Sequence, residues 1–238
     1  MSSFPPPPPV GDVPPASDGE RARPRTRAER QRETRAALVE SALVVFSRDG
    51  YHGANLEGIA NHAGFSKGAV YSNFDGKAEL FLAVMDRNLA AMQGEGWDPF
   101  GPVLLPPPTA MDTLEDGPAD LSELMRGLGL ATLEFIATAA RDELLAPALT
   151  RRAQVLLDAF RGVASASPAD GEPLAPEEVA VLLSALDQGF AVLALLGIVA
   201  PDSSLLRTGL RRLLDPTRAM TAGPAQAEQD GDEDAGGP

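Results

Sequence analysis

The sequence predicts an all-α protein, and three observations carry this prediction. Apolar residues recur at helical spacing through most of the chain, and no stretch alternates as a half-buried strand does. Clusters of glycine and proline divide the helical stretches from one another. Near the N-terminus, two short helical stretches flank a turn at Gly64, a spacing typical of a helix-turn-helix. We therefore expect a three-helix helix-turn-helix domain followed by a larger helical domain.

Four helices are predicted in the N-terminal part. The first begins near Arg27 and ends at Gly50, and its apolar face consists of Leu38, Val39, Ala42, Val45 and Phe46. Asn55 and Ser66 have side chains that cap helices, so they are expected to begin the second and third. The fourth follows from Lys77.

Four more helices are predicted after a loop over 93–119. Asp120 and Glu123 have the spacing of a capping box, and Pro176 suits a first helical position. Pro147 is expected to kink the helix that contains it. The expected helical ranges are 120–140, 142–165, 177–199 and 203–214.

The net charge of −14 is unevenly distributed. Residues 20–78 carry ten basic and seven acidic residues, a balance of +3, whereas the rest carries ten basic and twenty-seven acidic residues, a balance of −17. A basic module on an acidic body indicates a local surface for an anionic partner.

Composition excludes several classes of site. The chain has no cysteine, which removes disulfides, thiolate catalysis and cysteine-based zinc sites, and its two histidines make a Ser-His-Asp triad hard to assemble. We expect no catalytic residue, no metal site and no cofactor. A carboxylate-based helical hydrolase is the alternative, against which stands the lack of a visible nucleophile and base.

Residues 1–24, with a five-proline run, and the small acidic residues of 216–238 are expected to be disordered. The N-terminus lacks the features of a secretory signal. The longest apolar run, 189–200, has twelve residues and is too short to cross a bilayer. We expect a soluble cytoplasmic protein with domains over 25–78 and 79–215.

The stretch GFSKGAVYSNF, residues 64–74, holds one of the two tyrosines and one of the two lysines. If the stretch is helical, Lys67, Tyr71 and Phe74 share one side of the helix. The lysine could then meet one phosphate of a nucleic acid and the tyrosine hydroxyl another. A short connecting helix with a half-buried Tyr71 explains the same spacing equally well.

Residues 34–80 resemble the DNA-binding domain of TetR-family transcriptional regulators. The matching elements are the pattern IA..AGFSKGAVY.NF across the second and third helices, together with Ala42, Phe46, Gly50, Lys77, Glu79 and Leu80. The remainder of the chain matches this family in helical layout alone, in the part that the family uses for ligand binding and dimerisation.

The resemblance implies that the third helix enters the major groove of DNA and that flanking residues grip phosphates. The implied contact residues are Asn55, Ser66, Lys67, Gly68, Ala69, Tyr71, Ser72, Asn73 and Lys77. The sequence departs from the family at two of its positions. Asn55 stands where threonine is usual, and Gly76 stands where serine often caps the fourth helix, which weakens that cap or shifts it to Asp75.

Seven arginines lie between Arg21 and Arg35. One interpretation is an arm that follows the DNA backbone or enters the minor groove, through Arg21, Arg23, Arg25 and Arg27. A solvated, disordered arm without a DNA contact is an equal alternative.

The predicted helix over 177–199 is apolar on nearly every face, so it must be buried on all sides. Pairing with its own copy and with the helix over 203–214 would bury it in a homodimer, with an interface that includes Leu182, Leu186, Phe190 and Leu193. Two identical DNA-reading heads require a palindromic operator.

The larger domain contains no tyrosine, histidine or lysine, and its aromatic residues are mostly phenylalanine. We expect a small hydrophobic effector there, with Glu134, Phe135, Phe160 and Asp187 as candidate contacts, although the same residues could simply form the core. The predicted function is a homodimeric repressor that the effector releases from double-stranded DNA. The alternative within the same family is control by a protein partner.

Overall fold

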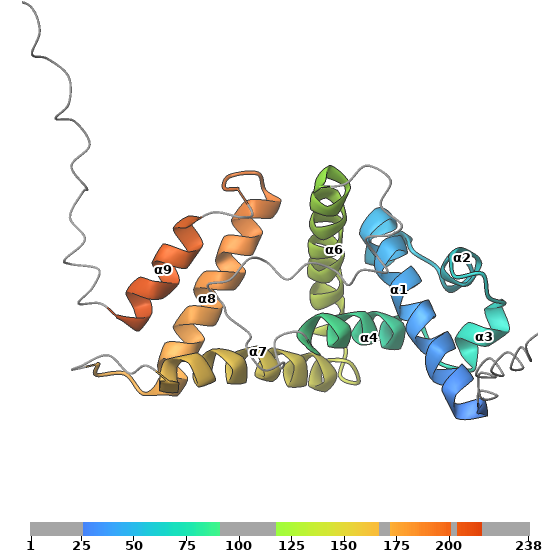
Figure 1. Cartoon of the computed structure of the whole chain (residues 1–238), viewed down its shortest axis with the longest axis horizontal. Coiled ribbons are helices and arrows are strands. Elements are labelled where there is room, and N and C mark those ends of the chain that lie inside the picture. The colour runs from blue at the N-terminus through green and yellow to red at the C-terminus, as the bar shows by residue number, and fades with distance from the viewer. Residues whose placement is uncertain (1–25, 91–117, 167–171, 201–203, 216–238) are drawn as a thin grey trace, which may run out of the picture.

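The computed structural model describes residues 26–90, 118–166, 172–200 and 204–215, and every regular element in these ranges is a helix. The predicted all-α class is confirmed. The predicted disordered ends, and the predicted loop up to residue 117, lie outside the described residues. The elements, labelled in Figure 1, are α1 (Arg27–Gly53), α2 (Leu56–His62), α3 (Lys67–Tyr71), α4 (Lys77–Ala90), α6 (Pro118–Ala139), α7 (Ala146–Ala166), α8 (Pro176–Leu195) and α9 (Ser204–Leu214).

α1 begins where predicted and changes direction where it was expected to end. The Thr26 hydroxyl accepts a hydrogen bond from the Glu29 N–H at 3.2 Å, and the Glu29 carboxylate accepts one from the Thr26 N–H at 2.6 Å. At Gly50 φ is +73°, a left-handed value that glycine adopts without strain. One more helical turn follows to Gly53, so Gly50 makes a kink in α1.

One hydrophobic core joins the N-terminal helices to α6. The rings of Phe46 from α1 and Phe81 from α4 meet at 4.8 Å, and Phe135 from α6 lies 4.7 Å from Phe81. Tyr51 packs against all three rings. The expected domain boundary at residue 78 therefore divides the chain inside α4 but does not divide the core.

α6 stands between the N-terminal helices and α8 (Figure 1). It crosses α1 so closely that a Cβ on Gly127 would lie 2.0 Å from the Ser47 carbonyl oxygen. It also meets α8, where a Cβ on Gly129 would lie 2.9 Å from Leu195 Cδ2. The two glycines thus allow two different helices to approach the backbone of α6.

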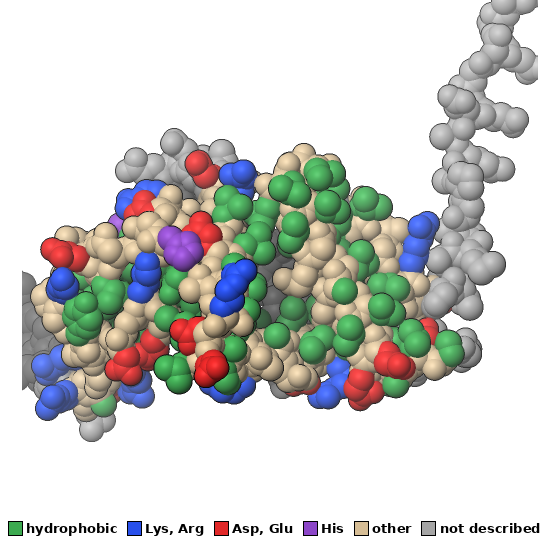
Figure 2. All heavy atoms as spheres, turned by 180° about the vertical axis from the view of Figure 1, so that it is seen from behind, with side chains coloured by type: hydrophobic (Ala, Val, Ile, Leu, Met, Phe, Trp, Pro, Cys, Tyr) green, Lys and Arg blue, Asp and Glu red, His purple; other side chains and the backbone are tan. Residues whose placement is uncertain are grey.

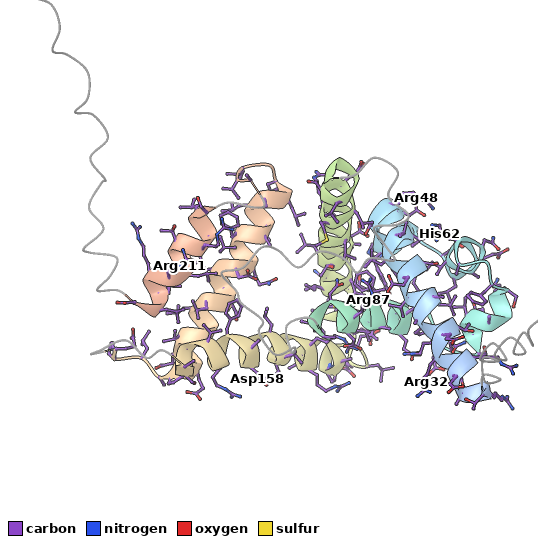
Figure 3. The ribbon with its side chains drawn as sticks, in the orientation of Figure 1. Arg32, Arg48, His62, Arg87, Asp158 and Arg211 are labelled. Carbon is purple, nitrogen blue, oxygen red and sulfur yellow. The ribbon has the colours of Figure 1, made fainter. Side chains whose placement is uncertain are left out.

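Two ion pairs brace α4. Arg87 donates two hydrogen bonds of 2.6 Å each to Glu40 of α1, and Figure 3 shows its place beside α1. Arg152 of α7 donates to Asp86 at 2.5 Å and to the Leu82 carbonyl at 3.3 Å. Both arginine side chains are largely buried, so solvent screens these pairs less than it screens surface pairs.

A second, smaller core lies between α7, α8 and α9, around Phe160, Leu183 and Leu210.

The structure corrects two expectations about prolines and helix starts and confirms a third. α7 begins at Ala146, so Pro147 lies in its first turn, where proline is tolerated, and makes no kink. α6 begins at Pro118, so Asp120 lies inside the helix instead of capping it. Pro176 is the first residue of α8, as predicted.

Among the described residues, α8 is the one helix that is long and apolar enough to cross a membrane by length and composition. The sequence prediction judged only the uninterrupted apolar run over 189–200, which overlaps the end of α8, and so missed this property. Of its most apolar window, 28% is buried inside the protomer. Core helices of soluble proteins pass the same test, and several apolar positions of α8 are exposed in the described part of the protomer.

The close crossing of α1 and α6 predicts the effect of a single methyl group. Gly127→Ala should lower the free energy of unfolding by about 1–3 kcal/mol, because the backbones must separate to admit the Cβ. Gly162→Ala is the matched control. A Cβ at position 162 of α7 would meet no described atom within 4 Å, so this substitution should stabilise the helix by about 0.5–1 kcal/mol. Thermal and urea unfolding measure both changes, and equal effects would contradict the described crossing.

Candidate nucleic-acid interface

Local chemistry fixes α2 and α3 relative to each other. Asn55 Oδ1 accepts from the Gly58 N–H at 2.8 Å, and Ser66 Oγ accepts from the Ala69 N–H at 3.3 Å, so both residues cap helices as predicted. Between the two helices, Gly64 has φ of +71° and ends α2. The caps and the left-handed glycine together form the helix-turn-helix geometry that the sequence predicts.

The outward face of α3 carries Lys67, Gly68, Tyr71 and Ser72. Tyr71 is 55% exposed, whereas Val70 on the opposite side is fully buried. Phe74 was expected to share a side with Lys67 and Tyr71, but it is 2% exposed. The helix ends at Tyr71, so helical spacing no longer governs the direction of the Phe74 side chain.

Three predicted contact residues take part in the hydrogen bonds that close α3. Ser72 Oγ donates to the Ala69 carbonyl at 2.9 Å, and Asn73 Nδ2 donates to the same oxygen at 2.8 Å. Asn73 is partly buried, and its Oδ1 is buried without a hydrogen-bond partner among the described residues. Ala69 is itself partly buried. Asn73 and Ala69 therefore face the protein more than the solvent, whereas Ser72 remains exposed.

Arg35 holds the end of α3 against α1, a role that sequence reasoning missed. Its guanidinium lies over the Phe74 ring at 4.0 Å, donates a hydrogen bond to the Asn73 carbonyl, and lies 3.6 Å from the Glu79 carboxylate. The sequence grouped Arg35 with the basic arm. No local signal marks its role, because its main partner lies 38 residues farther along the chain.

The turn after Gly50 is held from two sides. Lys77 Nζ donates to the carbonyls of His52 and Ala54, at 3.2 and 3.0 Å, and lies 4.8 Å from the centre of the Tyr51 ring. From α6, Glu134 accepts a hydrogen bond from the His52 N–H at 3.1 Å. Two of the three Lys77 donors are therefore used inside the protein, and its phosphate contact stays a prediction.

Two further electrostatic features belong to this end of the molecule. Lys67 Nζ lies 3.4 Å from Glu57 Oε2 of α2, and both side chains are more than half exposed. Water screens such a pair, so it contributes little to stability.

Burial raises the pKa of Tyr51, and the nearby charge of Asp142 adds to the shift. Tyr51 is thus a neutral core residue and not an outward donor like Tyr71.

The N-terminal part of the chain is similar in sequence to known proteins. Residues 38–84 match the model of the bacterial regulatory proteins of the tetR family. The chain carries a TetR-family domain. The transcriptional activator FasR of Mycolicibacterium smegmatis is 44% identical over 57 residues, which are 24% of this chain and 26% of FasR. The repressor TetR of Mycobacteroides abscessus is 40% identical over 70 residues, 29% of this chain and 37% of that protein.

These alignments span well under two thirds of the relatives, and they lie in the TetR-family domain. Both relatives are named as regulators of transcription and neither as an enzyme. A larger likeness exists in three dimensions. A Rhodococcus protein described as a TetR-family transcriptional regulator aligns with 77% of this chain and 99% of its own, with a TM-score of 0.55 and 20% identity. This likeness extends the TetR-type fold beyond the N-terminal domain.

The predicted arm of the TetR-family domain is described in part. Arg27 is exposed as the first residue of α1. Arg21, Arg23 and Arg25 lie outside the described residues, so their contact with DNA stays a prediction. Within the described residues, no group of three or more His, Asp or Glu side chains is placed to hold a metal ion.

The four predicted effector contacts do not come together. Phe135 is fully buried in the core that α6 shares with α1 and α4, and Phe160 is buried in the second core. Glu134 is occupied at the turn after Gly50. Asp187 on α8 is partly buried, and this burial raises its pKa although a hydrogen bond from Gln188 opposes the shift.

The four predicted interface residues of α8 also separate into two pairs. Leu182 and Leu193 are 44% and 40% exposed and lie on one side of the helix. Leu186 packs inward, toward Gly209 of α9, and Phe190 is buried. Spacing along an apolar helix could not separate these pairs, because every side of it looked suitable for burial.

The contacts of Lys77 predict that the two lysines of this domain have different roles. Lys77→Met should lower the free energy of unfolding by about 1 kcal/mol, because the carbonyls of His52 and Ala54 lose their common donor. The thermal midpoint should fall accordingly. Lys67→Met changes the same functional group on the exposed face of α3 and should leave the midpoint nearly unchanged. Circular dichroism melting curves compare the two. A Lys77 variant as stable as the Lys67 variant would refute the structural role.

Proposed function

We propose that this chain is a homodimeric, DNA-binding repressor of transcription that acts in the bacterial cytoplasm. The observation that carries this proposal is the outward face of α3, where Lys67 and Tyr71 are exposed. This short helix is held in place by its Ser66 cap and by the left-handed Gly64 before it. A rigid helix with exposed cationic and hydroxyl donors, in a TetR-family domain, fits the major groove of DNA. The two relatives named above are an activator and a repressor, so the direction of regulation is part of the proposal.

The contacts of this face divide into two kinds. The Tyr71 hydroxyl is suited to a phosphate, and so is the Lys67 ammonium, which can also reach acceptors on base edges. Gly68 presents no side chain, so a base edge or the DNA backbone can approach α3 closely at that point. Arg35 contributes indirectly, because it holds the end of α3 on α1.

Dimerisation through α8 and α9 is supported by apolar residues that stay exposed in the described part of the protomer. Leu182, Leu193 and Leu196 share one side of α8 with Gly189, and each of the three leucines is at least 40% exposed. A Cβ on Gly189 would meet nothing within 4 Å, so packing inside the protomer does not require this glycine. A partner helix that crosses at Gly189 could approach the backbone of α8 closely there, and it would bury the leucines around the glycine.

The proposed arrangement has a geometric consequence for the DNA. Figure 1 shows α2 and α3 at one end of the molecule and α8 with α9 at the other. A two-fold axis at the α8 end would place the two reading heads on the outside of the dimer. Identical heads related by a two-fold axis require an operator with two inverted half-sites.

The effector site that fits this structure differs from the residues that the sequence predicts. α6 and α8 meet where Gly129 faces Leu195, and in Figure 1 they separate toward α7. On the Gly129 side of α6, Met125, Leu133 and Ile136 remain exposed. On the Leu195 side of α8, Val181 and Val192 are exposed. Two apolar surfaces that face each other and remain uncovered suit a hydrophobic ligand.

Figure 2 shows hydrophobic side chains on both sides of a hollow near the middle of the molecule. Gln188 lies between Val181 and Val192 on the same side of α8, hydrogen bonded to Asp187. These two side chains are the polar groups that could orient a neutral or cationic ligand. Burial disfavours the charged form of the Asp187 carboxyl group and so raises its pKa. Carboxyl groups that are perturbed in this way cluster at functional sites.

Release from DNA would follow from the close contact of α6 with α1. An effector between α6 and α8 acts on α6, and α6 holds the turn after Gly50 through Glu134. An effector that binds better to one position of α6 shifts the dimer toward that position. It can do so only by its difference in affinity between the two states.

The DNA-binding proposal predicts a loss of binding without a loss of fold. Lys67→Ala combined with Tyr71→Phe should weaken binding to a duplex selected from a random pool by about tenfold or more. The melting temperature should stay nearly unchanged, because both side chains are exposed. Arg161→Ala removes a cation from an exposed ion pair on α7 and serves as the charge-matched control. Unchanged DNA affinity in the double variant would rule out α3 as the reading helix.

The dimer proposal predicts a specific pair of substitutions. Leu182→Arg with Leu193→Arg should convert the dimer to a folded monomer, because two charges would enter an apolar interface. Leu186 is avoided because it packs inside the protomer. Leu144→Arg, at a position 88% exposed before α7, is the control and should leave the dimer intact. Sedimentation at micromolar concentration distinguishes these states, and a monomeric unaltered protein would disprove the interface.

A further inference from the structure

The ion pair between Glu57 and Lys67 lies on the proposed DNA-reading surface. Glu57 is in the first turn of α2 and Lys67 is the first residue of α3, with 3.4 Å between Oε2 and Nζ. The two side chains are 65% and 55% exposed. A carboxylate in the first turn of a helix is favourable by itself, because it meets the positive end of the helix dipole. That effect stabilises α2 but does not require a contact with the lysine of the next helix.

A carboxylate at this place has a cost when DNA binds. Phosphates repel it, and a free lysine on the same surface would bind phosphates of any sequence. Each such lysine–phosphate contact steepens the dependence of log K on log salt by about 0.9. A lysine and a carboxylate that form an ion pair carry almost no net charge together, so the pair gains less from a phosphate than a free lysine does.

A base pair offers this ion pair a better match than a phosphate does. In the major groove, guanine presents the acceptors O6 and N7, and the cytosine paired with it presents the N4 amino donor beside them. A lysine donates to the first group and a glutamate accepts from the second. A donor and an acceptor held side by side on the protein are therefore complementary to a G·C pair, but not to a run of phosphate acceptors.

We propose that Glu57 is a specificity-determining residue, which accepts from the cytosine of a G·C base pair and directs Lys67 toward the guanine of that pair and away from phosphates. The proposal rests on the proposed DNA-binding function and deepens it. Glu57 lowers the affinity for non-specific DNA, and it adds a base preference that α3 would lack with a free lysine. Affinity is thereby exchanged for specificity on the same surface.

The test compares Glu57→Gln with the unaltered full-length chain on two probes. With random-sequence duplex DNA, Glu57→Gln should bind about threefold to tenfold more tightly at low salt, and its salt slope should steepen by about one unit. In selection from a random duplex pool, the unaltered chain should prefer G·C at one position of each half-site. Glu57→Gln should lose that preference while keeping the others.

Two controls separate this role from a general effect of charge. Asp158→Asn removes one negative charge from an exposed ion pair with Arg161 on α7, which Figure 3 shows well apart from α2 and α3. It should alter neither the random-DNA affinity nor the selected sequence. In a Lys67→Gln background, Glu57→Gln should no longer steepen the salt slope, because the lysine that it releases is absent.

The outcomes distinguish the two levels of the proposal. If the unaltered chain selects no sequence at all, the proposed function fails and this inference fails with it. If it selects an operator but Glu57→Gln leaves the base preference and salt slope unchanged, the inference alone is overturned. A steeper slope that persists without Lys67, or an equal effect from Asp158→Asn, also overturns it.

Discussion

The arrangement of this molecule depends on the contact of α6 with α1, where Gly127 leaves no room for a side chain beside the Ser47 carbonyl. This approach lets Phe135 of α6 enter the aromatic core formed by the N-terminal helices. α7, α8 and α9 pack around a second core, but the N-terminal helices and α6 share this one. Such a core transmits a displacement of α6, because close-packed interiors deform little.

Polar contacts complete the connection at both ends of the N-terminal helices. Glu134 of α6 and Lys77 of α4 both hold the turn after Gly50, and Asn55, the cap of α2, follows that turn directly. Farther along, Arg87 ties α4 to α1, and Arg152 ties α7 to α4. A movement of α6 or α7 would thus reach α2 through a few defined contacts, and these contacts support the proposed coupling of an effector to DNA binding.

The surfaces proposed for function are the places where burial is incomplete. α3 is five residues long and gains little stability of its own, so its position depends on the Ser66 cap and on Arg35 at the other end. α8 leaves leucines uncovered on one side and valines on another. The two exposed sides suit two different occupants, a second copy of the chain and an effector, because one side lies opposite α6 and the other lies away from it.

The sequence by itself determined the features that local chemistry controls. The all-helical class, the caps Asn55 and Ser66, the break at Gly64 and the outward Lys67 follow from neighbours within a few residues, and the structure confirms each of them. The resemblance over residues 34–80 identified the TetR-family domain for the same reason, since its pattern is local.

Only the tertiary structure decided which contacts form between distant segments. Arg35 and Glu134 meet partners 38 and 82 residues away, so no spacing in the sequence could reveal them. Phe135 became a core residue instead of an effector contact because Gly127 brings α6 against α1. On α8, the sequence indicated burial on every side. The packing of α7 and α9 chose the side with Leu186 and Phe190, and left Leu182 and Leu193 exposed. Hydrophobic burial has no direction of its own, so the partner helices determine which side is covered.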